Sequence, residues 1–258
     1  MKIAVCVATA TGGAATEADL LERRGRVGRA VLNPFDARAV EQALRMVEAQ
    51  GEGEIVLIAI ASAAELAIVR EGLALGAHRA IILDDPAIEG SDLIGTATAL
   101  ATLVRSESPD IVLGCFWSGD IDGTLMFGAA AARLGLPVIA QAQTLETGSG
   151  EALARRQVEV GDVTLATPLP CFVELADSIN KPRYPTMKAK LTAKSKPVRL
   201  CTLADLDAST MPVGAGLAGT RIAALVPPPA GRQPSILEGD AATAEAVLNF
   251  LKDREFVQ

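Results

Sequence analysis

Short apolar runs alternate with helical segments along the first 140 residues, and this alternation constrains the fold more than any other feature of the sequence. Runs rich in valine, isoleucine and leucine are typical of strands that are buried on both faces. Strands separated by helices imply a parallel sheet covered by helices on both sides, which is a Rossmann-like α/β fold. The predicted strands are Ile3 to Val7, Glu54 to Ala61, Arg79 to Leu83, Ile111 to Gly114 and Pro137 to Ala140.

The clearest helix start is Asn33-Pro34-Phe35-Asp36. Asn33 can cap the helix, and Asp36 suits its first turn. Pro34 can fill the first helical position, because that position needs no N–H. Gly51 is expected to end this helix. Further helices are predicted over about 63–75, over about 91–106 with Ser91 as its cap, and over 128–134.

The pattern changes after Gln141, where short strands joined by turns predict an antiparallel addition. The glycine- and proline-rich stretch Asp207 to Pro234 is expected to form an extended arm. A last helix, about Asp240 to Asp253, has one apolar side that suggests a partner. We therefore expect a domain over 1–200 and a C-terminal arm with its helix over 201–258. The short strands are predicted at Gln141 to Leu145, Leu153 to Val160, Val163 to Leu165 and Cys171 to Leu175.

The stretch Ile111 to Gly128 is a candidate nucleotide cradle, because a predicted strand there runs through a glycine-bearing turn into an alanine-rich helix. Backbone N–H groups at the start of a helix suit a phosphate. Ligands of parallel sheets gather at the carboxyl ends of the strands, which places the loops after Val7, Ala61 and Gly114 on one edge. Neither GxGxxG nor a P-loop pattern is present, so a plain structural corner is the alternative.

The composition argues against several classes of function. His78 is the only histidine, so Ser-His or Cys-His catalysis and zinc chemistry are not expected. A formal net charge of −7 argues against nucleic acid as the main partner. The cysteines show no CxxC pairing and are expected to be small buried residues in a reducing compartment, without disulfides or metal. They are Cys6, Cys115, Cys171 and Cys201.

The sequence carries no signal for a membrane or for export. No apolar run approaches the roughly 20 residues that a membrane span needs. The first residues form a predicted strand instead of a basic and apolar leader. No membrane span and a cytoplasmic location are therefore expected.

A basic segment stands out in this acidic chain. From Ser178 to Ala204 there are seven lysines and arginines and no acid. A basic loop with one exposed apolar residue suits brief docking, in which charge steers the encounter and the apolar side chain sets the position. An ordinary solvated loop is the alternative.

Several motifs, in the same order, resemble the beta subunit of electron transfer flavoproteins and together cover nearly the whole chain. The most specific is Asn180-Lys181-Pro182-Arg183-Tyr184 followed by a small residue, Thr186 and an apolar residue. The others are Asn33 to Asp36 with Ala39 to Leu44 behind it, Ala74 to Ala80, and Ile121 to Thr124.

The resemblance implies an adenine-nucleotide-binding α/β domain that pairs with an alpha subunit holding a redox FAD. It implies an AMP without redox role in this subunit and no catalytic residues of its own. Electrons would pass from donor dehydrogenases, through the alpha-subunit FAD, to a quinone reductase or another acceptor. A similar Asn-Lys-Pro-Arg-Tyr loop in systems for methylated amines favours a donor of that kind.

The same resemblance assigns residues to these tasks. A partner-recognition loop is expected over about 179–197, with Met187 as its apolar anchor, and Phe35 is expected to meet the flavin edge. The docking residues would be Pro182, Arg183, Tyr184, Met187 and Lys188. The residues expected to contact AMP are Cys6, Asn33, Pro34, Phe35, Asp36, Ala61, Ser62, Asp120, Ile121, Asp122, Gly123 and Thr124.

The chain also departs from the family pattern. Cys115-Phe116-Trp117 and Thr124-Leu125-Met126 offer fewer polar side chains to a phosphate, and Gln157 replaces a frequent glutamate. Two alternatives remain: a bifurcating type, in which this site holds a second, redox-active FAD and the complex oxidises NADH, and a stand-alone nucleotide-sensing module.

Overall fold

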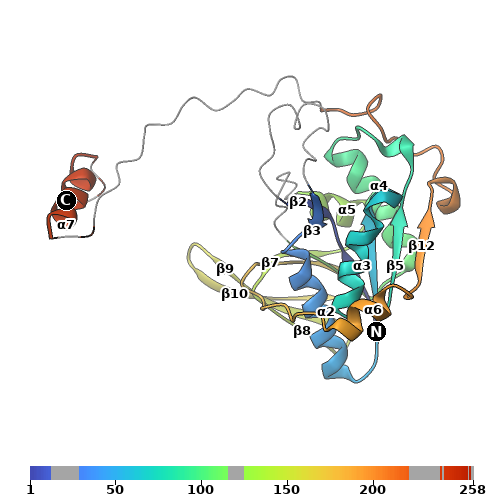
Figure 1. Ribbon diagram of the computed structural model, residues 1–258, viewed down its shortest axis with the longest axis horizontal. Helices are drawn as coiled ribbons and strands as arrows, with labels where there is room; N and C mark the ends of the chain where they lie inside the picture. The colour runs from blue at the N-terminus through green and yellow to red at the C-terminus, as the bar shows by residue number, and fades with distance from the viewer. Residues whose placement is uncertain (13–28, 116–124, 221–238, 240, 255, 257–258) are drawn as a thin grey trace. The chain divides into compact units, whose positions relative to one another are not determined.

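The structure, a computed structural model, describes residues 1–12, 29–115, 125–220, 239, 241–254 and 256. The chain divides into two compact units, Met1–Ala223 and Ala224–Gln258. The first unit contains the sheets (Figure 1). Residue 200, the domain boundary expected from the sequence, lies inside a strand of the main sheet, so the first unit continues past it.

The main sheet is parallel in every pair of neighbouring strands among the described residues. Its seven strands have the order β12-β5-β4-β1-β6-β11-β7, with β1 at the centre. The predicted parallel α/β fold is therefore confirmed. The strands are β1 (Lys2–Cys6), β4 (Glu54–Ile60), β5 (Arg79–Leu83), β6 (Ile111–Cys115), β7 (Val138–Ala142), β11 (Cys171–Leu175) and β12 (Val198–Cys201).

Helices cover both faces of this sheet (Figure 1). On one face, Ile3 and Val5 of β1 pack in a core with residues of α2 (Asp36–Gln50) and α3 (Leu66–Leu75). On the other face, Ala4 and Cys6 pack with α4 (Leu93–Glu107) and α5 (Met126–Leu134). Successive strand residues point to opposite faces, so one apolar strand supplies both cores.

Strand β11 lies between β6 and β7 in the parallel sheet, although the sequence suggested one more short strand of the antiparallel addition. All five of its residues are buried. A strand that is covered on both faces needs a continuous apolar run, which Cys171 to Val173 supplies.

The antiparallel addition is confirmed and forms a separate three-stranded sheet, β10-β9-β8. Its strands are β8 (Thr144–Gly148), β9 (Glu151–Val158) and β10 (Gly161–Pro168). The short strands β2 (Thr9–Gly12) and β3 (Arg29–Leu32) form an antiparallel pair.

Two helix starts differ from the prediction. Helix α2 begins at Asp36, with Phe35 at the capping position, whereas Asn33 uses its side-chain oxygen to accept from the Phe35 N–H. The Asn33 side chain therefore stabilises the turn before the helix. Helix α4 is capped by Asp92, whose carboxylate accepts from the Gly95 N–H, instead of by Ser91.

The basic segment is more regular than the loop expected from the sequence. It contains α6 (Met187–Ala193), which Thr186 caps, and then the edge strand β12. Short 3₁₀ helices lie at Ala63–Glu65, Pro86–Ile88 and Ala204–Leu206. In the second unit, the bounds of α7 (Ala241–Lys252) agree with those of the predicted last helix to within one residue at each end.

Candidate functional site

The carboxyl ends of β1 and β6 meet the start of α2 at one edge of the sheet. The Asp36 carboxylate accepts from the Ala8 N–H at 2.7 Å, and the Asn33 N–H donates to the Ala8 carbonyl at 3.2 Å. Both Asn33 and Asp36 are buried. The segment after β1 is therefore fixed to the turn that opens α2. A ligand at this edge stays a prediction.

Two thiols lie beside this junction. The Cys115 thiol donates to the Phe35 carbonyl at 2.7 Å. Burial, with a smaller effect of the Asp36 charge, raises the pKa of both the Cys6 and the Cys115 thiol. Both therefore stay protonated at neutral pH, which suits neither metal binding nor nucleophilic attack. All four cysteines are free and buried, so their predicted role as small buried residues is confirmed.

The other predicted nucleotide contacts are placed as follows. Ala61 and Ser62 follow β4 at the same edge, and the Ser62 hydroxyl donates to the Glu65 carboxylate at 3.0 Å. Pro34 is exposed, and Phe35 is partly buried against the core. Residues 120–124 lie outside the described part of the chain, so their place in the site stays a prediction.

The structure adds one residue to this edge that the sequence analysis did not select. Glu174 of β11 is only 4% exposed, and burial raises the pKa of its carboxyl group to about 7. The sequence of β11 does not predict the burial of Glu174, because a single glutamate in an apolar run gives no direct sign of burial.

The recognition segment, residues 179–197, is held against α2. The Asn180 amide donates to the Arg38 carbonyl at 3.0 Å, and Arg38 donates in return to the Asn180 carbonyl at 2.6 Å. The Arg183 guanidinium contacts both Glu41 and Glu48. Arg183, a predicted docking residue, therefore has intramolecular partners that hold the segment in place.

The outer face of this segment carries exposed apolar side chains among cations. Tyr184 is 90% exposed, Met187 73% and Leu191 62%. Met187 and Leu191 lie one helical turn apart on α6 and share a face. Pro182 is partly buried, whereas Lys188, Lys190 and Lys194 are exposed.

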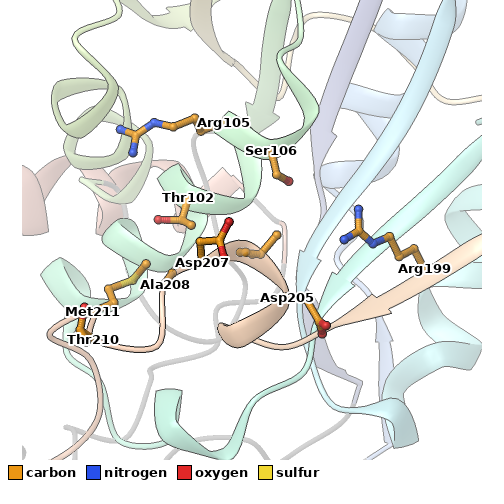
Figure 2. Close-up of a pocket in the computed structure, with 10 residues that line it drawn as sticks. Thr102, Arg105, Ser106, Arg199, Asp205, Asp207, Ala208, Thr210 and Met211 are labelled. Atoms are coloured by element: carbon orange, nitrogen blue, oxygen red, sulfur yellow. The ribbon is translucent and has the colours of Figure 1, made fainter.

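A separate surface depression of about 560 Å³ lies where α4 meets β12 and the segment after it. In the view of Figure 2, Arg105 and Arg199 lie on opposite sides of the depression, with Asp205 and Asp207 also in its lining. None of the predicted site residues lines it. The mixture of both charges favours no particular ligand, and we assign it no role.

The described residues contain no cluster of three side chains that suits a metal ion. Within the same residues, every helix is too short or too polar to cross a bilayer.

Comparisons with known proteins give the family. The pattern of the electron transfer flavoprotein domain matches residues 25–206. The chain is 32% identical to the electron transfer flavoprotein subunit beta of Mycobacterium leprae, over 78% of this chain and 77% of that protein. It is 26% identical to the same subunit of Megasphaera elsdenii, over 100% of this chain and 99% of that protein. It is also 26% identical to the caffeyl-CoA reductase-Etf complex subunit CarD of Acetobacterium woodii, over 88% of each chain. The chain therefore belongs to the family of electron transfer flavoprotein beta subunits, and its role lies in electron transfer.

Proposed function

We propose that this chain is the beta subunit of a heterodimeric electron transfer flavoprotein. It pairs with an alpha subunit that holds FAD, and the pair accepts electrons from a dehydrogenase and passes them to an acceptor such as a quinone reductase. The observation that carries this proposal is the exposed face of Tyr184, Met187 and Leu191 on a segment tied to α2.

A fixed apolar patch among lysines suits a transient partner. Steering by charge raises the encounter rate, and a small apolar contact adds affinity without a long-lived complex. The patch is preorganised, because Arg183 and Asn180 bind α2 at its base. Less conformational entropy is then lost when a dehydrogenase docks.

The C-terminal helix α7 is the proposed contact with the alpha subunit. Within its own unit, Val247 and Leu248 are each 45% exposed and Phe250 is 52% exposed. A short helix with exposed apolar residues gains stability from burial against a partner. Phe35 is proposed to meet the flavin edge of that partner.

The edge formed by β1, β4 and β6 is the proposed site of AMP, with the contacts predicted above. The protonated thiols of Cys6 and Cys115 and the buried carboxylate of Asp36 lie at this edge, and none of them is assigned a redox or nucleophilic role. We propose accordingly that the chain positions a nucleotide and a partner and has no catalytic residues of its own. AMP would have a structural role.

A complex that holds a second FAD is the alternative, and similarity to a subunit of a caffeyl-CoA reductase complex favours it. Release of the bound ligand by denaturation and its identification separate the possibilities. AMP supports the carrier, FAD supports the bifurcating type, and ATP supports a stand-alone nucleotide-sensing module. Expressed alone, the chain should be colourless, whereas co-purification with the alpha subunit should give a flavin spectrum.

Docking is tested with Met187→Ala in the heterodimer. We expect the second-order rate of flavin reduction by the donor dehydrogenase to fall about tenfold, because a central apolar anchor is lost. Dehydrogenases of methylated amines are the first donors to test. Ile94→Ala, a truncation of a 49% exposed residue on α4 across the sheet, is the matched control. An unchanged rate for Met187→Ala, with an unchanged flavin spectrum, would remove Met187 from the docking surface.

A further inference from the structure

Helix α6 carries two of the three side chains of the proposed docking face, which consists of Tyr184, Met187 and Leu191. The helix has seven residues, which is too short for a helix to be stable by itself in water. Its Ala193 is 2% exposed, lies on the opposite side of the helix from Leu191 and packs in the core that contains residues of α3. Helices α3 and α6 lie side by side (Figure 1). The direction of the docking face therefore depends on the contacts that hold α6 on α3.

The carboxyl ends of α3 and α6 are joined by two cations that reach in opposite directions. The Arg70 Nη1, from α3, donates to the Ala193 carbonyl at 2.6 Å and to the Lys196 carbonyl at 3.0 Å. The Lys196 Nζ donates back to the Leu73 carbonyl at 2.9 Å and to the Ala77 carbonyl at 2.6 Å. Each helix end thus receives a cation from the other segment, and we call Arg70 and Lys196 together the reciprocal clamp.

The reciprocal clamp satisfies groups that a helix end leaves without a partner. The last carbonyls of a helix accept from no N–H of the same helix, and the helix dipole attracts a cation to this end. Arg70 and Lys196 are both partly buried, so water competes less for these bonds than for an exposed ion pair. Burial also lowers the pKa of the Lys196 ammonium, and the two carbonyls offset this cost of burying its charge. The chain after α6 is therefore fixed to the end of α3.

The two ends of α6 have separate anchors. At the amino end, Thr186 caps the helix, and Arg183 contacts Glu41 of α2. At the carboxyl end, the reciprocal clamp begins at Ala193, two residues after Leu191. Leu191 is therefore the residue of the docking face whose position depends most on the clamp.

We infer that Arg70 is a positioning residue for docking, which together with Lys196 holds Leu191 in the exposed face that a donor dehydrogenase meets. The inference rests on the proposed docking function and names a residue that sets the shape of that face. Arg70 acts from α3 through the carboxyl end of α6 and does not itself belong to the docking face. An ordered face loses less conformational entropy on docking, so loss of the clamp should weaken docking and leave electron transfer within the docked pair unchanged.

The test is stopped-flow reduction of the heterodimer by a dehydrogenase of methylated amines, the same donor as for Met187→Ala. Varying the dehydrogenase concentration separates the half-saturating concentration, which reports docking, from the limiting rate, which reports electron transfer. Arg70→Met keeps an apolar stem and removes the donors, so the half-saturating concentration should rise about fivefold at an unchanged limiting rate. Arg70→Lys should recover most of this loss, because both bonds come from one nitrogen and an ammonium also has several donors.

A double variant shows whether Arg70 acts through Leu191. In Leu191→Ala the positioned side chain is gone, so the addition of Arg70→Met should raise the half-saturating concentration little further. Arg105→Met is the matched control, because Arg105 donates to the carbonyl of Arg133 in the last turn of α5, at 3.5 Å and on the other face of the sheet. This control loses the same charge and a similar contact, and it should leave both kinetic quantities unchanged.

Hydrogen exchange gives a second measurement that needs no donor. The Lys194 and Ser195 N–H groups donate to the Leu191 and Thr192 carbonyls of α6. These two amides should exchange faster in Arg70→Met than in the wild type, because the end of α6 opens more often without the clamp. Equal exchange in the two proteins would overturn the inference whatever the donor.

An unchanged half-saturating concentration for Arg70→Met would overturn the inference even if the Tm fell, because the clamp would then serve stability alone. Additive losses in the double variant would do the same. If Arg70→Met does not fold, Lys196→Met breaks the other half of the clamp and should give a similar rise. If Met187→Ala and Leu191→Ala both leave the reduction unchanged, the docking face itself fails and the inference with it, while the identity of the released ligand still tests the proposed flavoprotein.

Discussion

The Arg183 Nε lies 2.7 Å from the Glu41 Oε2, although the two residues are 142 positions apart in the sequence. The contact joins the recognition segment to α2, the helix whose first turn forms part of the candidate nucleotide edge. Glu41 is buried at its carboxylate, and Arg45 also contacts it. The proposed docking surface and the candidate nucleotide edge therefore both contact α2.

Removal of this contact should loosen the recognition segment. We expect Glu41→Ala to lower the free energy of unfolding by about 1–2 kcal/mol. The expected loss is smaller than for a fully buried ion pair, because the Arg183 side chain is 41% exposed and water screens its charge. Denaturant unfolding measures this. Glu48→Gln, at the exposed second partner, should have a much smaller effect. Equal losses for both variants would contradict a special role of Glu41.

The same pair should make stability depend on pH. Burial acts to raise the pKa of the Glu41 carboxyl, but hydrogen bonds from Arg183 and Arg45 outweigh it and hold this pKa below its usual value. A carboxyl with a lower pKa in the folded chain stabilises the fold above the unfolded-state pKa, and this stability is lost as the pH falls through the folded-state pKa. From about pH 5 to about pH 3, the Tm of the wild type should fall more steeply than that of Glu41→Gln. Parallel curves would exclude this linkage.

The start of the arm is held by Asp92. One of its carboxylate oxygens caps α4 at Gly95, and the other accepts from the Gly219 N–H at 2.8 Å and from the Thr220 N–H at 3.2 Å. Asp92→Asn should keep the cap and lose the second set of bonds, because an amide offers only one acceptor oxygen. We expect faster hydrogen exchange at Gly219 and Thr220 with unchanged exchange at Gly95. Unchanged exchange at all three would show that Asp92 does not hold the arm.

Substitution by alanine should have opposite effects on stability at two glycines near the candidate cradle, Gly114 and Gly128. A Cβ added at Gly114 would overlap the Phe127 ring, so Gly114→Ala should destabilise the protein by about 1–3 kcal/mol. A Cβ at Gly128 meets nothing within 4 Å, and in a helix alanine is favoured over glycine by about 1 kcal/mol. Thermal unfolding of the two variants compares them. A stabilised Gly114→Ala would mean that the Phe127 ring moves aside at no cost.

Strands buried on both faces could be located from the sequence because burial demands continuous apolar runs. Arg79 to Leu83 and Cys171 to Leu175 have the predicted bounds, and the other predicted strands of the parallel sheet differ by one or two residues at an end. The position of β11 in the sheet could not be predicted, because neighbours in a sheet are joined by backbone hydrogen bonds that depend little on residue type. β12 was not predicted because two of its four residues, Arg199 and Leu200, are exposed and its pairing to β5 forms the sheet edge.

The candidate site could be outlined only in part. The residues around Asn33 and Asp36 do lie at the end of β1, since the ends of parallel strands share an edge. The burial of Glu41 and of Glu174 was not predicted. A glutamate in a helix or strand is usually exposed, and its burial depends on a partner that is distant in the sequence.

The sequence by itself determined the family and the parallel α/β class, because apolar periodicity and local motifs are properties of adjacent residues. The edge at which a ligand would bind stays a prediction. Only the tertiary structure decided which charges meet. It paired Arg183 with Glu41, buried Glu174 in β11 and left Met187 with Leu191 on an exposed face. The physical reason is that burial and charge pairing act through space between segments that the order of residues along the chain does not bring together.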